Sequence, residues 1–265
     1  MRYLLLLLLT ASILTGCSDT ANRSEAPDDE DSATAGMESS GEMNDEEVMI
    51  HPVYHGSLVL MSQGKTIYVD PHGGAQRYTQ YGAPDLVLIT HTHGDHMDTA
   101  TLNGLDLSTA SLVAPAAVTE ALGDEMFTSS HTMANGDEYR WEEIGITAIP
   151  AYNPPPKENF HPQGEFNGYV LAFGDQRMYV SGDTEGVPAM RDLEDIDVAF
   201  VCMNLPYTMD INQAADAVVA FAPAVVYPYH YRNQDGSFSD VEEFQRIVTA
   251  ENGEIEVRLE DWYGE

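Results

Sequence analysis

The segment Leu88–Asp98 reads LITHTHGDHMD, and its density of polar ligand-type residues governs how the rest of the chain is interpreted. Three histidines and two aspartates fall within eight positions, directly after the aliphatic run DLVLIT. They are His91, His93, Asp95, His96 and Asp98. Alternate side chains of an extended segment lie on one side, whereas a turn at Gly94 directs the following residues elsewhere. The spacing therefore indicates two adjacent metal sites rather than one.

Imidazole and carboxylate groups suit Zn(II), and also Fe or Mn, better than Mg or Ca. Two metal ions need about seven protein ligands and a shared water, and the loop supplies only part of that number. Further candidates follow apolar runs later in the chain or lie in loops: His131, His161, Asp183 and His230. Asp183 follows the strand-like run MYVSG, and His230 ends the run AVVYPYH. The sequence thus predicts a centre of two divalent ions, with zinc favoured.

The motif HTHGDH matches the HxHxDH signature of the metallo-β-lactamase superfamily, and the other pieces follow in the family's order. These are an aspartate in TIYVDP, a later histidine, SGDT and a terminal strand ending in histidine. The resemblance covers about residues 50 to 262. The segments AYN, FHPQGEFNGYVL, MYVSGDTEGVPAM, YTMD and YPYHY are similar to one branch in particular. It comprises small metal-dependent hydrolases related to ascorbate-6-phosphate lactonase and to N-acylphosphatidylethanolamine phospholipase D.

The resemblance implies a ligand set. The first metal ion would be bound by His91, His93 and His161, the second by Asp95, His96 and His230, and Asp183 would bridge both. Asp70 in YVDP matches an aspartate that supports the ligand loop through hydrogen bonds. His131 is the alternative to His161, which is favoured because His131 lies in a polar stretch before GITAIP. Asp95 or Asp183 would also receive or relay a proton during catalysis.

The function implied is hydrolysis of a small molecule. A hydroxide bridging two metals would attack an ester or lactone carbonyl, or a phosphodiester. The best-known zinc β-lactamases carry cysteine at the position of Asp183 and often replace the histidine at position 96, so penicillin cleavage is not favoured. The alternatives are a catalytically inactive metal-binding protein and an envelope structural lipoprotein on the same scaffold.

The N-terminal segment MRYLLLLLLTASILTGC has one arginine and a short leucine-rich core, as an export signal has. Its ending LTGC resembles a bacterial lipobox, which predicts cleavage after residue 16 and lipidation of Cys17. Residues 17–47 are acidic and almost free of aliphatic residues, so they are expected to form a disordered tether. The hydrolase domain is expected over residues 48–265. The protein would then be exported and held by its lipid in the cell envelope, on the periplasmic or extracellular face.

The charge balance excludes one class of partner. The chain of 265 residues has 44 acidic and 11 basic residues, a net charge of −33. Nucleic-acid binding relies on lysine and arginine displacing counterions, so we expect no nucleic-acid partner. Beyond Cys17 the only cysteine is Cys202, so the domain cannot contain an internal disulfide.

Short apolar runs separated by turn residues predict an α/β (α+β) protein, and the resemblance implies a four-layer αββα sandwich of two mixed sheets. Gly174 and Asp175 are expected to turn a hairpin. A helix is predicted from a cap at Asp210 to just before Pro223, and another from Ser239 or Asp240. His55, in the first strands, is interpreted as a hydrogen-bonded packing residue, with support of the metal loop as the alternative. His72 is interpreted as a solvent-exposed turn residue, with a place on the pocket rim as the alternative.

Overall fold

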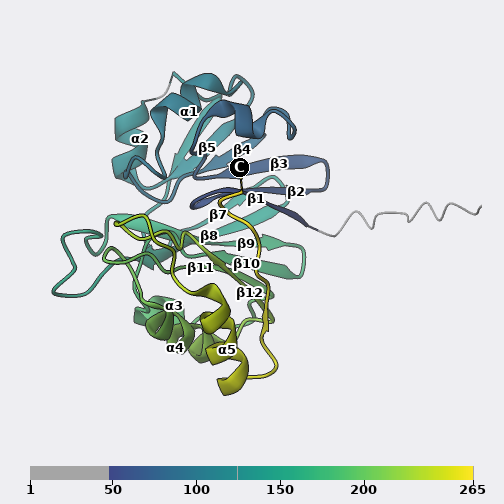
Figure 1. The fold of residues 1–265 in the computed structure, drawn as a ribbon. Helices are drawn as coiled ribbons and strands as arrows, with labels where there is room; N and C mark the ends of the chain where they lie inside the picture. Colours follow the sequence, from purple (N-terminus) through teal and green to yellow (C-terminus); the bar gives the residue numbers. More distant parts are fainter. Residues whose placement is uncertain (1–47, 124, 265) are drawn as a thin grey trace, which may run out of the picture. The chain divides into compact units, whose positions relative to one another are not determined.

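The computed structural model describes residues 48–123 and 125–264, and these contain two β-sheets (Figure 1). The first sheet has six strands in sequential order: β1 (Met49–Tyr54), β2 (Ser57–Ser62), β3 (Lys65–Val69), β4 (Leu86–Leu88), β5 (Ser111–Ala114) and β6 (Ser129–Thr132). β1 to β3 pair antiparallel, and β3 to β6 pair parallel. The carboxyl ends of four strands therefore lie at one edge of this sheet.

The second sheet mirrors this mixed pattern. Its seven strands lie in the order β13 (Glu256–Val257), β12 (Val225–Tyr229), β11 (Val198–Cys202), β10 (Gln176–Val180), β9 (Phe166–Phe173), β8 (Ile144–Ala151) and β7 (Glu138–Trp141). β10 to β13 are parallel, whereas β7 to β10 pair antiparallel. The predicted hairpin joins β9 and β10, with Phe173 opposite Gln176.

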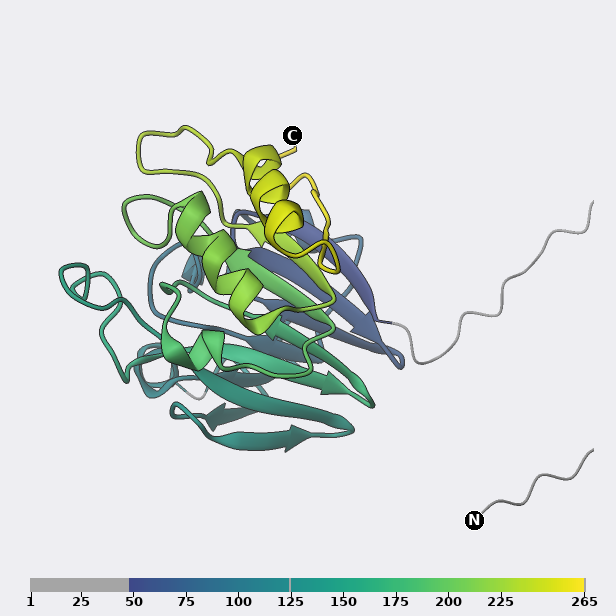
Figure 2. The ribbon, with the colours of Figure 1, turned by 90° about the horizontal axis from the view of Figure 1, so that it is seen from below.

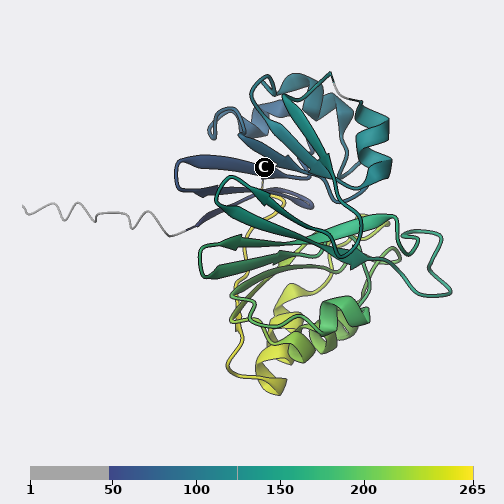
Figure 3. The same cartoon turned by 180° about the vertical axis from the view of Figure 1, so that it is seen from behind.

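Helices cover the outer face of each sheet. The 3-10 helix η1 (Ala75–Tyr78), α1 (Thr99–Gly104) and α2 (Ala116–Leu122) lie with the first sheet, and α3 (Pro188–Arg191), α4 (Ile211–Phe221) and α5 (Val241–Glu251) lie with the second. Figures 1 and 3 show the two sheets face to face between these helical layers. Figure 2 shows α4 and α5 running side by side across the second sheet. The expected four-layer αββα sandwich is confirmed.

The buried apolar side chains form two clusters, one on each face of the first sheet. In β2, Leu58 and Leu60 join the large cluster that includes residues of both sheets, whereas Val59 joins a second cluster containing residues of α1 and α2. Successive strand residues point to opposite faces, so a strand covered on both sides needs apolar residues throughout. This is why SLVLMS and KTIYV read as continuous apolar runs.

The two long helices begin where the sequence predicts. The Asp210 carboxylate accepts hydrogen bonds from the backbone N–H groups of Asn212 and Gln213, and Gln213 Oε1 accepts one from the Asp210 backbone N–H. This capping box fixes the start of α4, which ends at Phe221, before Pro223. Asp240, rather than Ser239, caps α5.

The sequence analysis did not identify three of the strands, β6, β7 and the two-residue β13, and all three lie at sheet edges. β6 reads SSHT and lies at a sheet edge with mostly exposed side chains, and β7 reads EYRW at an edge of the other sheet. An edge strand packs on fewer neighbours, so its apolar alternation is weak.

No helix in the described ranges is long and apolar enough to span a membrane. The predicted signal segment, Cys17 and the acidic tether lie outside the described residues.

Candidate metal centre

The candidate ligands follow strands whose carboxyl ends lie at the same edge of each sheet. Asp70 follows β3, and the HTHGDH loop follows β4. In the second sheet, Asp183 follows β10 and His230 follows β12. Parallel pairing within each sheet aligns these ends, and face-to-face packing of the sheets brings the two sets together.

One group of side chains is largely buried. It consists of His91, His93, His161 and Asp183, each offering one ligand atom within 4.8 Å of the others. His91 Nε2 lies 3.1 Å from His93 Nδ1, and His161 Nε2 lies 3.4 Å from Asp183 Oδ2. His91 and His161 are buried, as is Asp183, while His93 is more exposed.

A second group shares Asp183 with the first. Its members are His96, Asp183 and His230, again with ligand atoms within 4.8 Å. The Nε2 atoms of His96 and His230 face each other at 2.9 Å, and each lies 3.4 Å from Asp183 Oδ1. Asp183 therefore presents Oδ2 to the first group and Oδ1 to the second.

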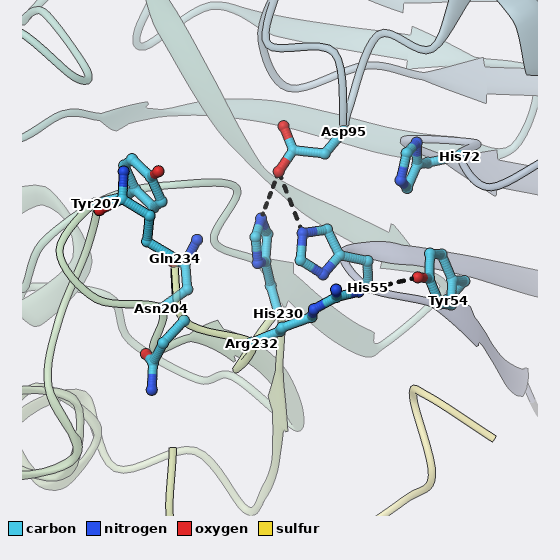
Figure 4. A pocket seen from close by; sticks show the side chains of 10 residues that line it. Tyr54, His55, His72, Asp95, Asn204, Tyr207, His230, Arg232 and Gln234 are labelled. Atoms are coloured by element: carbon cyan, nitrogen blue, oxygen red, sulfur yellow. Dashed lines mark hydrogen bonds and ion pairs between the residues drawn. The ribbon is translucent and has the colours of Figure 1, made fainter. Parts of the chain in front are cut away.

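Asp95 lies beside this second group on its solvent side. Its Oδ2 is 3.5 Å from His230 Nε2 and 3.2 Å from His55 Nε2 (Figure 4). His55, Asp95 and His230 form a third set with ligand atoms within 4.8 Å. The sequence analysis favoured a packing role for His55. The structure places its ring in contact with Asp95 and His230, beside the candidate ligands.

The β1–β2 turn carries His55 to this position. His55 has a φ of 58°, in the left-handed region, and its Nδ1 lies 2.9 Å from the Tyr263 hydroxyl. The next residue, Gly56, packs so closely that a Cβ there would lie 2.9 Å from His96 and 3.1 Å from His230. The one available sequence signal was the HGS turn, in which glycine permits this approach.

The arrangement of donor atoms fits metal ions. Two ring nitrogens that face each other at 2.9 Å need either a shared proton or a cation between them. Among the described residues, both ring nitrogens of His161 and Oδ1 of Asp183 are buried without a hydrogen-bond partner. Buried polar atoms normally have a hydrogen-bond partner, so these unpartnered atoms point to ligands for an ion.

Asp70 supports the ligand loop through hydrogen bonds. It accepts hydrogen bonds from the Thr90 backbone N–H at 2.7 Å and the Thr90 hydroxyl at 2.6 Å. His96 Nδ1 donates to Asp70 Oδ2 at 2.7 Å, which leaves Nε2 of the same ring free towards Asp183. A ligand histidine is commonly oriented by a carboxylate in this way, so Asp70 has the supporting position that the resemblance implied.

Electrostatics keep the two carboxylates ionised and His91 neutral. Burial raises the pKa of the Asp183 carboxyl, but the charges of His230 and His96 outweigh it and hold this pKa well below its usual range. For Asp95, hydrogen bonds from His230 and His55 likewise outweigh burial and lower its pKa. Burial and the charge of His96 hold the pKa of His91 well below its usual value. Ionised carboxylates and neutral imidazole are the forms that bind metal. Burial lowers the pKa of His96, but the charges of Asp183 and Asp70 outweigh it and hold this pKa well above its usual value, so a metal ion would displace a proton from this ring.

His131, the alternative to His161, lies elsewhere. It belongs to β6, and its ring stacks on Tyr139 with centroids 3.6 Å apart. It is absent from the three groups of described residues that could hold an ion, whereas His161 is in the first. The structure thus brings all seven predicted ligands together and leaves His131 outside.

A cavity of about 200 Å³ opens on the side of Asp95 and His230. Ten residues line it: Tyr54, His55, His72, Asp95, Asn204, Tyr207, His230, Arg232, Asn233 and Gln234 (Figure 4). His72 is therefore not a freely exposed turn residue, because it lines the cavity and its Nδ1 lies 3.1 Å from Asp98 Oδ2. Asp98 also caps α1, accepting from the backbone N–H groups of Ala100 and Thr101.

Residues 50–230 match the profile of the family described as "Beta-lactamase superfamily domain". The chain belongs to the metallo-β-lactamase superfamily. Its fold, its HTHGDH loop and the strand-end aspartate and histidine agree with this membership. The particular branch suggested by the sequence stays a prediction.

Several relatives within the superfamily carry the name UPF0173 metal-dependent hydrolase. One from Deinococcus radiodurans is 31% identical over 182 residues, covering 67% of this chain and 78% of its own. Another from Pyrococcus horikoshii is 28% identical and covers 76% of this chain and 92% of its own.

Solved structures also resemble this chain. One described as a metal-dependent hydrolase from Parabacteroides distasonis is 36% identical, with a TM-score of 0.71, and the match covers 80% of this chain and 92% of that one. A metallo hydrolase from Ignicoccus hospitalis, 24% identical with a TM-score of 0.68, shares the fold over 81% of this chain and 95% of its own.

Proposed function

We propose that this metal-dependent hydrolase holds two divalent metal ions, with zinc favoured, and cleaves an ester, a lactone or a phosphodiester of a small molecule. The observation that carries the proposal is the position of Asp183. Its two carboxylate oxygens face two different groups of histidines, with contacts of 3.4 Å on each side. A carboxylate placed in this way bridges two ions rather than binding one.

The ligands divide between the two positions. His91, His93 and His161 would hold the first ion, Asp95, His96 and His230 the second, and Asp183 both. Bound there, the ions would lower the pKa of a water molecule to near neutrality and polarise the group that is attacked. Asp183 and His96 are almost fully buried, so they fix the distance between the two positions.

Asp95 is the residue we assign to proton transfer. Its side chain is 39% exposed, whereas that of Asp183 is 4% exposed, so Asp95 is the carboxylate that a substrate in the cavity can reach. Asp95 Oδ2 lies 3.2 Å from His55 Nε2 and 3.5 Å from His230 Nε2, so the carboxylate lies at the cavity beside the metal positions, where it can accept a proton from water. Asp183 is enclosed and serves to hold the centre together.

The test uses the full chain. Bound metal is measured by mass spectrometry, and hydrolysis of lactone, phosphodiester and β-lactam substrates is followed with and without a chelator. We expect about two ions per chain and activity that the chelator removes and Zn(II) restores. His131→Ala, which removes a histidine away from the centre, is the matched control and is expected to keep both metal and activity. A chain without bound metal would overturn the ligand assignment, and metal without turnover would support an inactive metal-binding protein.

The location of the protein is a separate proposal, motivated by the segment LTGC. We infer that Cys17 is lipidated and that the domain is held in the cell envelope. Cells fed an alkyne-labelled palmitate should yield a labelled, membrane-bound chain, and Cys17→Ser should remove both properties. Cys202→Ser is the control, because Cys202 is buried in β11. Label retained in Cys17→Ser would refute the lipidation site.

A further inference from the structure

Basic residues are rare in this chain, and most of those that the structure describes are paired with carboxylates. Ion pairs are formed by six of them: Lys65, Arg140, Lys157, Arg191, Arg246 and Arg258. Within residues 48–123 and 125–264, three arginines form none: Arg77, Arg177 and Arg232. With 44 acidic residues in the sequence, an arginine without a carboxylate partner is conspicuous.

Two of these three arginines meet at one side chain, Tyr54 on the wall of the cavity. Arg77 Cζ lies 4.2 Å from the centre of the Tyr54 ring, in a cation–π contact. Arg232 Nη1 donates to the Tyr54 hydroxyl at 3.3 Å. Figure 4 shows Arg232 beside His55, on the same cavity as Asp95 and His230. One arginine, Arg232, therefore lines the cavity, and a second, Arg77, packs on the Tyr54 ring of its wall.

Hydrogen bonds connect this arginine to the candidate metal centre. The Arg232 backbone N–H donates to the Tyr263 hydroxyl at 3.1 Å, and that hydroxyl lies 2.9 Å from His55 Nδ1. His55 in turn contacts Asp95. These contacts fix the Arg232 backbone beside His55, and the hydrogen bond from Nη1 to Tyr54 holds the guanidinium on the cavity wall.

A negatively charged substrate would need such a site. The chain has a net charge of −33, and its field repels anions at long range. A guanidinium presents a planar fork of donors that matches the oxygens of a carboxylate or a phosphate. Since no carboxylate of the described residues occupies Arg232, those donors remain available to a ligand.

We propose that Arg232 binds a negatively charged oxygen group of the substrate, a carboxylate or a phosphate, with Arg77 as a second, more distant positive charge. This inference rests on the proposed function, because the charged group would orient the bond to be cleaved towards Asp95 and the metal positions. The substrate class is accordingly an anionic ester or lactone, or a phosphate ester that carries a further charge. Arg232 selects the substrate by its charge and takes no part in bond cleavage.

The test compares three para-nitrophenyl esters with the metal-loaded full chain. The acetate is neutral, the succinate monoester carries a carboxylate and the phosphonoacetate carries a phosphonate. We expect kcat/KM to be higher for a charged ester than for the acetate, and the preferred charged ester identifies the group. Arg232→Gln should lower kcat/KM for the charged ester about tenfold or more, mainly through KM, and lower kcat/KM for the acetate by a much smaller factor.

Two further variants guard against a general charge effect. Arg140→Gln removes the same charge from an exposed site on β7 and should change none of the three rates. Arg232→Lys should restore part of the preference, because the charge returns without the planar fork. Equal losses for all three esters in Arg232→Gln, or no loss at all, would overturn the inference.

Failure of the proposed function gives a different result. If a chelator leaves hydrolysis unchanged, or no ester is cleaved, the metal-dependent reaction on esters is refuted. The inference about Arg232 is then judged by calorimetric binding of the corresponding para-nitroanilides. Tighter binding of the charged anilide that is lost in Arg232→Gln supports it, and equal binding of charged and neutral anilides contradicts it.

Discussion

The two sides of the centre differ in exposure although they share Asp183. On one side His91 and His161 are 1% and 0% exposed, whereas on the other the side chains of His55 and Asp95 are 13% and 39% exposed. The open side, with His55, Asp95 and His230, lines the cavity, and the buried side, with His91 and His161, does not. The ligands His96 and His230 of the second group are nonetheless as buried as His161. The difference in access to the cavity indicates a division of roles, in which the buried side holds an ion and the open side meets the substrate.

The largest effect is expected from a substitution of Asp183, which the two groups of ligands share. Asp183→Ala removes the one residue that faces both groups, so it should lower metal content on both sides. Loss of a residue that merely orients a ligand costs about 10- to 100-fold, so kcat/KM should fall by more than about 100-fold here. Metal analysis and steady-state kinetics measure the two losses. A variant that keeps two ions and near-normal rates would show that Asp183 is not a bridge.

A smaller but more selective effect separates the two sides. His161→Ala should release an ion from the buried side, whereas His55→Ala should retain the metal and lower kcat about tenfold, since His55 orients Asp95. His55→Gln, which can still donate to Asp95, should recover part of the rate. Metal content and kcat measured on the same samples decide the matter, and metal loss from His55→Ala would assign His55 to the ligands.

The smallest effect is expected at Cys202 in β11, between the strands that precede Asp183 and His230. This thiol is fully buried in β11, where burial and the charge of Asp183 raise its pKa to about 12. A protonated, enclosed thiol reacts slowly, so iodoacetamide should leave Cys202 unmodified in the native chain and alkylate it after denaturation. Peptide mass spectrometry measures the labelling of Cys202. Rapid labelling of the native protein would show that the second sheet opens readily around this residue.

The sequence was sufficient to predict the ligands that lie on one loop or directly after a strand. His91, His93, Asp95 and His96 share one loop, and Asp183 and His230 each follow an apolar strand, so the alignment of parallel strands brings them together. The capping box of α4 and the β9–β10 hairpin were predictable for the same reason, because each is encoded by neighbouring residues.

The positions of His55 and Arg232 could not be predicted, because they depend on how the sheets pack. His55 lies in the β1–β2 turn of the first sheet, and its ring is 3.9 Å from that of His230, which follows β12 of the second. The HGS turn allows a close approach of the backbone, but it does not encode which residue of the other sheet is contacted. Arg232 likewise acquires its setting from Tyr54 and Tyr263, which lie far from it in the chain.

The facing nitrogens of His96 and His230 belong to residues 134 positions apart, one on each sheet. An ion held by both would act as a cross-link between the two halves of the sandwich. In the chain-entropy account, a covalent link that closes a loop of about 100 residues stabilises the fold by roughly 4–5 kcal/mol. The described residues contain one cysteine and so have no covalent link of this kind. Bound metal would then stabilise the packing of the two sheets against unfolding, in addition to supporting catalysis.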